Sequence, residues 1–310
     1  MEKIALVGAG RVGEAAAQIL AKEQMARELM LIALHEGVAQ GTALDIQESA
    51  GLFGFDTRVR GHHELRAIEG ADLIVISAGV PRKPGMSRSD ILDANLPVID
   101  SICREAQRSA PNAMLLMVTN PVDVLTHLAW RIVGWDRRRV FGLSGVLDGA
   151  RMASFVAEAA GVSAKDVQTL VIGGHGDSMV PLPRFSTIGG IPLGHFMTAA
   201  AIGRVVERTR TGGAEILALK KNSSAYDAPG AAIAVMADAI VHDRKRLLAC
   251  VAVLNGEYGQ HDLSMGVPVV LGRNGVERIV QLELDAGERA ALERSAGAIR
   301  ADLDRLKQSA

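Results

Sequence analysis

Short, nearly uninterrupted apolar runs alternate with amphipathic stretches along the first half of the chain. The runs are rich in Val, Ile, Leu and Met, as expected of strands buried on both faces, and occupy residues 3–8, 29–34, 71–79, 113–120 and 139–144. The stretches between them carry apolar side chains at helical spacing, over residues 14–24, 38–49, 94–109 and 121–133. Strands that alternate with helices of this length indicate βαβ units, and therefore a parallel sheet covered by helices on both faces.

The rhythm changes after about residue 145. A helix is predicted at 149–160, a strand-rich and turn-rich stretch at 170–193, and long helices at 198–221 and 227–242. Apolar runs at 247–255, 266–272 and 275–284 suggest an antiparallel meander, and a final helix places one apolar stripe on a neighbour through Leu292, Ala296, Ile299, Leu303 and Leu306. The sequence thus predicts an α/β protein: a Rossmann-type doubly wound parallel sheet over residues 1–145, followed by a smaller α+β domain over residues 146–310.

Composition limits the kinds of partner. The 310 residues are 48% hydrophobic and 22% charged with a formal net charge of −1, so no overall field favours nucleic acid or anionic lipid, and we expect neither as a partner. No apolar run reaches 18 residues and no basic leader precedes the first strand, so we expect no membrane span and no secretion signal. Cys103 and Cys250 are too few for a disulfide framework or a zinc cluster; we expect no metal and a cytoplasmic location.

The first predicted strand ends in a glycine-rich turn. Residues 8–13 read G-A-G-R-V-G, placed between a strand and a helix. Gly8 allows the tight turn, Gly10 lets the backbone approach a pyrophosphate, and Gly13 lets the helix pack closely on the strand. Together with the free N–H groups at the helix N-terminus, this pattern predicts a dinucleotide site.

One part of the dinucleotide fingerprint is missing. An acid is expected at the end of the second strand, where it would bind the ribose hydroxyls, but Ala33 occupies that position. Glu36 could substitute from the following loop, or the site could accept a 2′-phosphate with His35 nearby. We therefore expect NAD, and NADP stays open.

A loop rich in cations follows the strand at 71–79. Residues 79–90 read GVPRKPGMSRSD, with Arg82, Lys83 and Arg88 against the single acid Asp90. A solvated loop is the simplest interpretation. However, ligands of open α/β sheets bind beyond the carboxyl ends of the strands, which is where this loop and Asn120 emerge.

Three further motifs follow in order: TNPVD at 119–123, LDGAR at 147–151 and GGHGD at 173–177. With GAGRVG, the cationic loop and MVPLPRFSTIGGIPL at 179–193, they cover nearly the whole chain. In these motifs the sequence resembles the lactate/malate dehydrogenase family, and within it the malate dehydrogenases of the lactate-dehydrogenase-like type.

The resemblance implies roles for five residues. His175 would exchange the proton at the substrate's C2 oxygen, and Asp148 would orient the imidazole and stabilise its charged form. Arg151 would bind the substrate's C1 carboxylate with both arms of its guanidinium group. Arg88 would polarise the carbonyl once the loop has closed, and Asn120 would hydrogen-bond the substrate oxygen.

Arg82 bears on the choice of substrate. Lactate dehydrogenases carry a neutral glutamine there, whereas an arginine would pair with the second carboxylate of malate or oxaloacetate. The segment 223–229 also resembles the malate type, with the small Ala225, although Asp227 stands where an aromatic or apolar residue is expected. A lactate-type or broader 2-hydroxy-acid dehydrogenase remains the nearest alternative, and a non-enzymatic dinucleotide sensor a more distant one.

The resemblance also extends to the cofactor and to assembly. The cofactor-binding set is Gly8, Ala9, Gly10, Arg11, Val12, Gly13, Ala33, Asn95, Val118 and Asn120. The expected partners are a small dicarboxylate substrate and further copies of the chain, in a homodimer or homotetramer.

Overall fold

A parallel sheet organises the first half of the molecule. The computed structural model describes residues 1–80, 88–221 and 223–309. Six parallel strands run in the order β3-β2-β1-β4-β5-β6, namely β1 (Lys3–Val7), β2 (Glu28–Ile32), β3 (Arg58–His62), β4 (Leu73–Ile76), β5 (Met114–Met117) and β6 (Val140–Leu143). Every residue of β4 and β5 is buried, which explains why their sequences are uninterrupted apolar runs. The expected Rossmann-type sheet is confirmed.

The strand β3 did not stand out in the sequence. It reads R-V-R-G-H, and Val59 is its one fully buried side chain. The polarity follows from its position, because β3 forms the edge of the sheet and pairs only with β2. An edge strand lacks the continuous apolar pattern by which the central strands were found.

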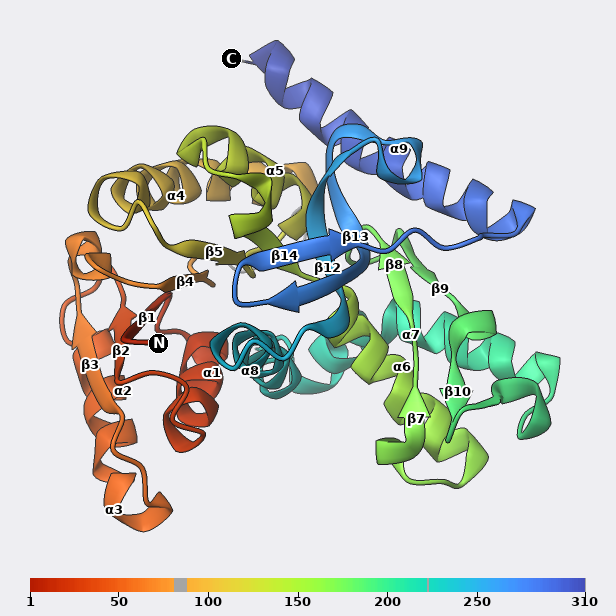
Figure 1. The fold of residues 1–310 in the computed structure, drawn as a ribbon, viewed down its shortest axis with the longest axis horizontal. Helices are drawn as coiled ribbons and strands as arrows, with labels where there is room; N and C mark the ends of the chain where they lie inside the picture. Colours follow the sequence, from red (N-terminus) through yellow and green to blue (C-terminus); the bar gives the residue numbers. More distant parts are fainter. Residues whose placement is uncertain (81–87, 222, 310) are drawn as a thin grey trace.

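Helices cover both faces of this sheet. They are α1 (Arg11–Lys22), α2 (Val38–Glu48), the short α3 (Ala50–Phe53), α4 (Arg88–Ser109) and α5 (Val122–Val133). Figure 1 shows α4 and α5 on one side of the sheet and α1 on the other. The helix α4 begins at Arg88 rather than near residue 94, directly after the stretch 81–87.

The second half extends the same sheet with antiparallel strands. The strand β12 (Arg246–Asn255) pairs with β6, and the order continues through β13 (His261–Gly272), β8 (Val171–Gly173) and β9 (Met179–Pro181), while β14 (Gly275–Ile279) pairs with β13. A separate small sheet contains β7 (Val167–Gln168), β10 (Thr187–Ile188) and β11 (Ile191–Pro192). The expected meander is present, although its last strand ends at Ile279.

Four long helices complete the fold: α6 (Gly145–Ala160), α7 (Ala199–Lys220), α8 (Asp227–Val241) and α9 (Ala286–Ser309). The helix α8 packs closely on α1, because a Cβ atom at Gly230 would lie 2.8 Å from the Cβ of Ala15. The predicted stripe of α9 is buried up to Leu303, with Ile299 fully inaccessible, and Leu306 is half-buried. One core cluster contains residues of both halves, from Ile4 to Leu303, so the division at residue 145/146 remains a prediction.

The basic run Arg137–Arg139 forms a short 3₁₀ turn before β6. Each guanidinium group has a partner: Arg137 binds Glu257 and the carbonyl of Val253, Arg138 binds Asp136, and Arg139 donates to two backbone carbonyls. The run is therefore part of the fold, and its charges do not form an open anion site.

Candidate active site

The glycine-rich turn after β1 has a different structural reason for each of its glycines. Gly8 adopts a φ of +117°, and a Cβ there would lie 2.5 Å from the backbone N of Ala78. At Gly13 a Cβ would overlap the carbonyl oxygen of Gly8. At Gly10 nothing lies within 4 Å of the added atom. The first and third glycines are thus required by packing, while the second leaves the N-terminus of α1 open to a ligand.

The remaining residues of the turn surround this opening. Ala9 is buried, Val12 is half-buried and Arg11 is exposed at the first position of α1. The guanidinium carbon of Arg11 lies 5.4 Å from the ring centre of Tyr226, in the segment before α8. A diphosphate at the free N–H groups of α1 would therefore have a cation beside it.

Two neighbouring strand ends are joined by Asn95 of α4. Its side chain is 1% exposed; Oδ1 accepts the backbone N–H of Val80 at 2.7 Å, and Nδ2 donates to the carbonyl of Asn120 at 2.9 Å. Val118, next to this junction, is half-buried, and the side chain of Asn120 is exposed. Asn95 therefore fixes the backbone of Val80, after β4, relative to that of Asn120, after β5.

The end of β2 has no acid. Ala33 is half-buried and donates its N–H to the carbonyl of His62 on β3, and the next three side chains, Leu34, His35 and Glu36, are exposed. In the part of the chain that the structure describes, no carboxylate of β2 takes the position expected to bind ribose hydroxyls.

The acid–base residues expected in the second half lie together. Nδ1 of His175 lies 2.8 Å from Oδ2 of Asp148, and Oδ1 of Asp148 accepts from a guanidinium nitrogen of Arg151 at 3.0 Å. The side chain of Asp148 is 1% exposed, that of Arg151 12% and that of His175 16%. Because a carboxylate can only accept, Nδ1 carries a hydrogen and Nε2 is left for proton exchange.

The electrostatic surroundings favour the charged imidazole. Burial acts to lower the pKa of His175, but the carboxylates of Asp148 and Asp123 outweigh it, so this pKa lies above its ordinary value. The guanidinium group of Arg151 opposes them. A histidine in this setting can hold a proton near neutral pH and release it to a substrate.

The turn that carries His175 is held from two sides by residues that sequence reasoning did not select. The backbone N–H of His175 donates to Oδ2 of Asp123 on α5 at 2.8 Å, and that of Gly174 donates to Oγ of Ser295 on α9 at 2.7 Å. Both acceptor side chains are buried. Asp123 belongs to the TNPVD motif, which was a usable signal; Ser295 has no local signal at all.

Gly212 is a third residue that the sequence did not reveal. It lies on α7, and a Cβ there would overlap Cδ of Arg151, with Nε only 3.1 Å away. Because residue 212 has no side chain, the aliphatic part of Arg151 can occupy this space. α7 therefore sets where the guanidinium group can be placed.

Of the predicted site residues, Arg82 and the side chain of Arg88 are not among the described parts of the chain. Arg88 is the first residue of α4, about two turns before Asn95 on the same helix, but its side chain is not described. Asp227 now has a structural role: it starts α8, and its carboxylate lies 3.8 Å from Nζ of Lys220.

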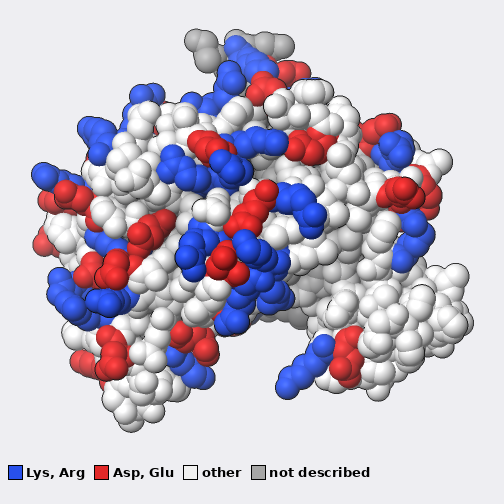
Figure 2. Space-filling view, in the orientation of Figure 1, with Lys and Arg blue, Asp and Glu red and all other residues white. Residues whose placement is uncertain are grey.

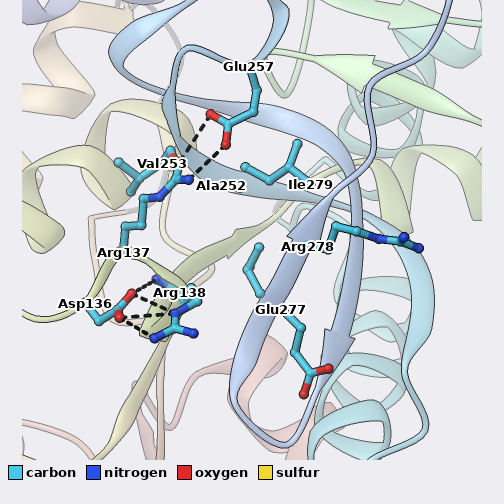
Figure 3. Close-up of a pocket in the computed structure, with 10 residues that line it drawn as sticks. Asp136, Arg137, Arg138, Ala252, Val253, Glu257, Glu277, Arg278 and Ile279 are labelled. Carbon is cyan, nitrogen blue, oxygen red and sulfur yellow. Dashed lines mark hydrogen bonds and ion pairs between the residues drawn. The ribbon is translucent and has the colours of Figure 1, made fainter.

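Charges outside the site are mixed and paired. Figure 2 shows positive and negative side chains intermingled over the face that it draws. A pocket of about 290 Å³ beside β12 and β14 shares no residue with the predicted site, and Figure 3 shows Arg137 joined to Glu257 and Arg138 joined to Asp136 at its wall.

Among the described residues no group of three His, Cys, Asp or Glu side chains could hold a metal ion. The helices described include none long and apolar enough to cross a membrane.

A parallel sheet with a glycine turn at its first strand, and an Asp–His pair beyond it, defines the class of dinucleotide-dependent dehydrogenases. Two family models match nearly the whole chain: the NAD-binding domain of lactate/malate dehydrogenases matches residues 2–142, and their alpha/beta C-terminal domain matches residues 145–310. The chain belongs to the lactate/malate dehydrogenase family. The resemblance inferred from its motifs is confirmed.

Similar proteins cover the full length. A malate dehydrogenase of Thioalkalivibrio sulfidiphilus is 60% identical over 99% of this chain and 100% of its own. Among solved structures, a malate dehydrogenase from Salinibacter ruber superposes with a TM-score of 0.94 at 43% identity, covering 99% of this chain and 98% of its own. A lactate dehydrogenase from Cryptosporidium parvum, complexed with lactic acid and nicotinamide adenine dinucleotide, gives a TM-score of 0.95 at 36% identity with the same coverage. The fold alone therefore does not separate the two substrates.

Proposed function

We propose that the protein is a malate dehydrogenase that reversibly converts (S)-malate to oxaloacetate with a nicotinamide dinucleotide. The observation that carries the proposal is the linked set His175–Asp148–Arg151, with contacts of 2.8 and 3.0 Å. It combines a proton donor, the carboxylate that orients it and a cation for an acidic substrate. The full-length malate dehydrogenase relatives support the same activity.

The site residues divide the reaction between binding and proton transfer. Arg151 uses one nitrogen on Asp148 and has further N–H groups for the C1 carboxylate of the substrate. Nε2 of His175 gives its proton to the C2 oxygen when oxaloacetate is reduced, and takes the proton back when malate is oxidised. Asp148 stabilises the imidazolium form that precedes reduction. A bound dinucleotide supplies or accepts the hydride.

The described residues fit a dinucleotide at the turn after β1. An added Cβ at Gly10 would meet no atom within 4 Å, and Gly10, which precedes α1, has no side chain that could cap the first N–H groups of the helix. The residues that would hold the diphosphate are Gly8 to Gly13, with Arg11 beside them. Val118 and Asn120 would contact the cofactor from the end of β5.

Arg82 and Arg88 would complete the substrate site. In a pocket closed to water, an arginine that faces the second carboxylate favours oxaloacetate and leaves an unpaired charge with pyruvate. We expect kcat/KM for oxaloacetate to exceed that for pyruvate greatly. In Arg82→Gln, kcat/KM for oxaloacetate should fall about a hundredfold or more while pyruvate gains. Equal efficiency on both substrates in the unaltered protein would favour a broader 2-hydroxy-acid dehydrogenase.

NAD is the proposed cofactor, with NADP as the alternative that Ala33 leaves open. The test compares kcat/KM for NADH and NADPH in the unaltered protein and in Ala33→Asp. The new carboxylate would accept ribose hydroxyls and repel a 2′-phosphate, so the NADH/NADPH ratio should rise about tenfold or more. An unaltered protein that prefers NADPH would reverse the assignment.

We further propose a homodimer or homotetramer located in the cytoplasm. Large apolar side chains are exposed on and near α2 and α3, where a second copy would cover them: Leu34, Val38, Leu44, Leu52 and Phe53. Light scattering coupled to gel filtration should give a mass of at least two chains. A monomer at micromolar concentration would contradict this proposal.

A further inference from the structure

A second buried carboxylate lies behind the catalytic histidine, and the reaction described above does not use it. Asp123 is on the first turn of α5 and is 0% exposed. Its Oδ2 accepts the backbone N–H of His175 at 2.8 Å, across 52 residues of sequence. It is therefore a buried contact of the residue proposed to exchange the proton.

Asp123 and Ser295 accept the backbone N–H groups of adjacent residues, but their side chains differ in charge. Removing a carboxylate from water costs several kcal/mol unless nearby positive charge compensates. Ser295 shows the cheaper solution, because its neutral hydroxyl accepts the N–H of the adjacent Gly174 at 2.7 Å. The N-terminus of α5 stabilises the charge of Asp123 in part. Unlike that hydroxyl, the carboxylate of Asp123 brings a negative charge that favours the protonated imidazole of His175.

The charged side chains that bear on this imidazole, among those described, are few. Asp148 and Arg151 come from α6, and their charges have opposite signs. Asp123 comes from α5 and favours the charged imidazole. Asp148 shares its carboxylate between His175 and Arg151, so a second negative charge offsets the guanidinium group.

We propose that Asp123 is a positioning residue that fixes His175 through its backbone N–H and holds the imidazole in its protonated form. The same residue connects two parts of the site, since it follows Asn120 by one short turn at the start of α5. Ser295 fixes the neighbouring peptide without a charge. The proposal rests on the proposed dehydrogenase function.

The test is the pH profile of kcat/KM for oxaloacetate, measured at saturating NADH with the full-length protein. Reduction needs protonated His175, so the profile is flat at low pH and falls as pH rises through the midpoint of His175. In Asp123→Asn the midpoint should move down by about one pH unit or more. Activity should then match the unaltered protein at low pH and be about tenfold lower above both midpoints. For malate oxidation, which needs neutral His175, the rise should move to lower pH by the same amount.

Ser295→Ala is the matched control. It removes a buried hydrogen bond to the same turn but no charge, so kcat should fall severalfold with the midpoint kept. If Asp123→Asn does not fold, Asp123→Ser takes its place, since serine is also neutral and its hydroxyl can accept a backbone N–H. NADH binding, followed by its fluorescence, verifies folding in each variant.

The outcomes separate the two proposals. A midpoint that stays in place in the neutral variants of Asp123, or that moves as far in Ser295→Ala, overturns the role of Asp123 alone. If the unaltered protein fails to reduce oxaloacetate at any pH, the proposed function fails instead.

Discussion

The two halves of the molecule build their parts of the site by different means. In the parallel half, the turn after β1 requires glycine at two positions, because a Cβ atom at Gly8 or Gly13 would overlap backbone atoms. In the antiparallel half, the site is built from side-chain contacts: His175, Asp148 and Arg151 are joined by hydrogen bonds near 3 Å. The glycine turn presents backbone N–H groups, and the set His175–Asp148–Arg151 presents charges.

This difference separates recognition from chemistry. A diphosphate carries charge in every redox state, so a fixed set of backbone donors can hold it throughout a turnover. A proton must be transferred during the reaction, and this transfer requires a side chain whose protonated and neutral forms are close in free energy. Damage to the glycine turn should therefore weaken cofactor binding, and damage to the set His175–Asp148–Arg151 should slow the reaction at unchanged cofactor affinity.

The largest effect is expected from His175→Asn. Asparagine has a similar size but cannot exchange a proton, so kcat should fall by about 10³-fold or more. NADH affinity should stay within a factor of about two, because the glycine turn is untouched. Stopped-flow reduction of oxaloacetate and NADH fluorescence titration measure the two quantities. Full turnover in this variant would exclude His175 as the acid.

Gly212→Ala should give the next largest effect. The new methyl group would overlap Cδ of Arg151, so the guanidinium group must shift. A displacement on the order of 1 Å at a substrate-orienting group can reduce the rate about a hundredfold, and kcat/KM for oxaloacetate should fall by that order. Gly203→Ala on the same helix is the control, because nothing lies within 4 Å of its added atom. If both substitutions behave alike, Gly212 has no special relation to Arg151.

The sequence predicted the elements and motifs whose signal is local. The central strands β4 and β5 are buried on both faces and read as apolar runs, and the glycine turn lies within six consecutive residues. It also identified His175, Asp148 and Arg151 by family resemblance, and the structure brings them together. The pairing of His175 with Asp123 spans 52 residues and that of Gly174 with Ser295 spans 121, so neither contact can be predicted from a local pattern, although Asp123 itself lies in the TNPVD motif.

The glycine turn offers a more modest comparison within the parallel half. Gly8→Ala introduces a side chain at a φ of +117° and 2.5 Å from a backbone nitrogen, a strain of about 1–3 kcal/mol. It should lower both the thermal midpoint and NADH affinity, the latter by about tenfold. Gly10→Ala meets no protein atom within 4 Å, so its thermal midpoint should stay while NADH affinity falls. Equal loss of stability in both variants would remove the distinction between a packing glycine and a ligand-facing one.

The smallest effect is expected where the two halves meet over the phosphate turn. The ring centre of Tyr226 lies 5.4 Å from the guanidinium carbon of Arg11 and 3.6 Å from Nζ of Lys220. The same Nζ lies 3.8 Å from a carboxylate oxygen of Asp227. Exposed cation–π contacts contribute about 0.5–1 kcal/mol each, so Tyr226→Ala should weaken NADH binding about two- to fivefold by releasing Arg11.

Tyr226→Phe keeps the aromatic face and should bind NADH as the unaltered protein does. In an Arg11→Met background, Tyr226→Ala should have almost no further effect, because the cation that the ring orients is gone. Full additivity of the two substitutions would mean that the ring acts on the cofactor independently of Arg11. The antiparallel half would then contribute to dinucleotide binding directly, and binding of the diphosphate would not depend on the glycine turn and Arg11 alone.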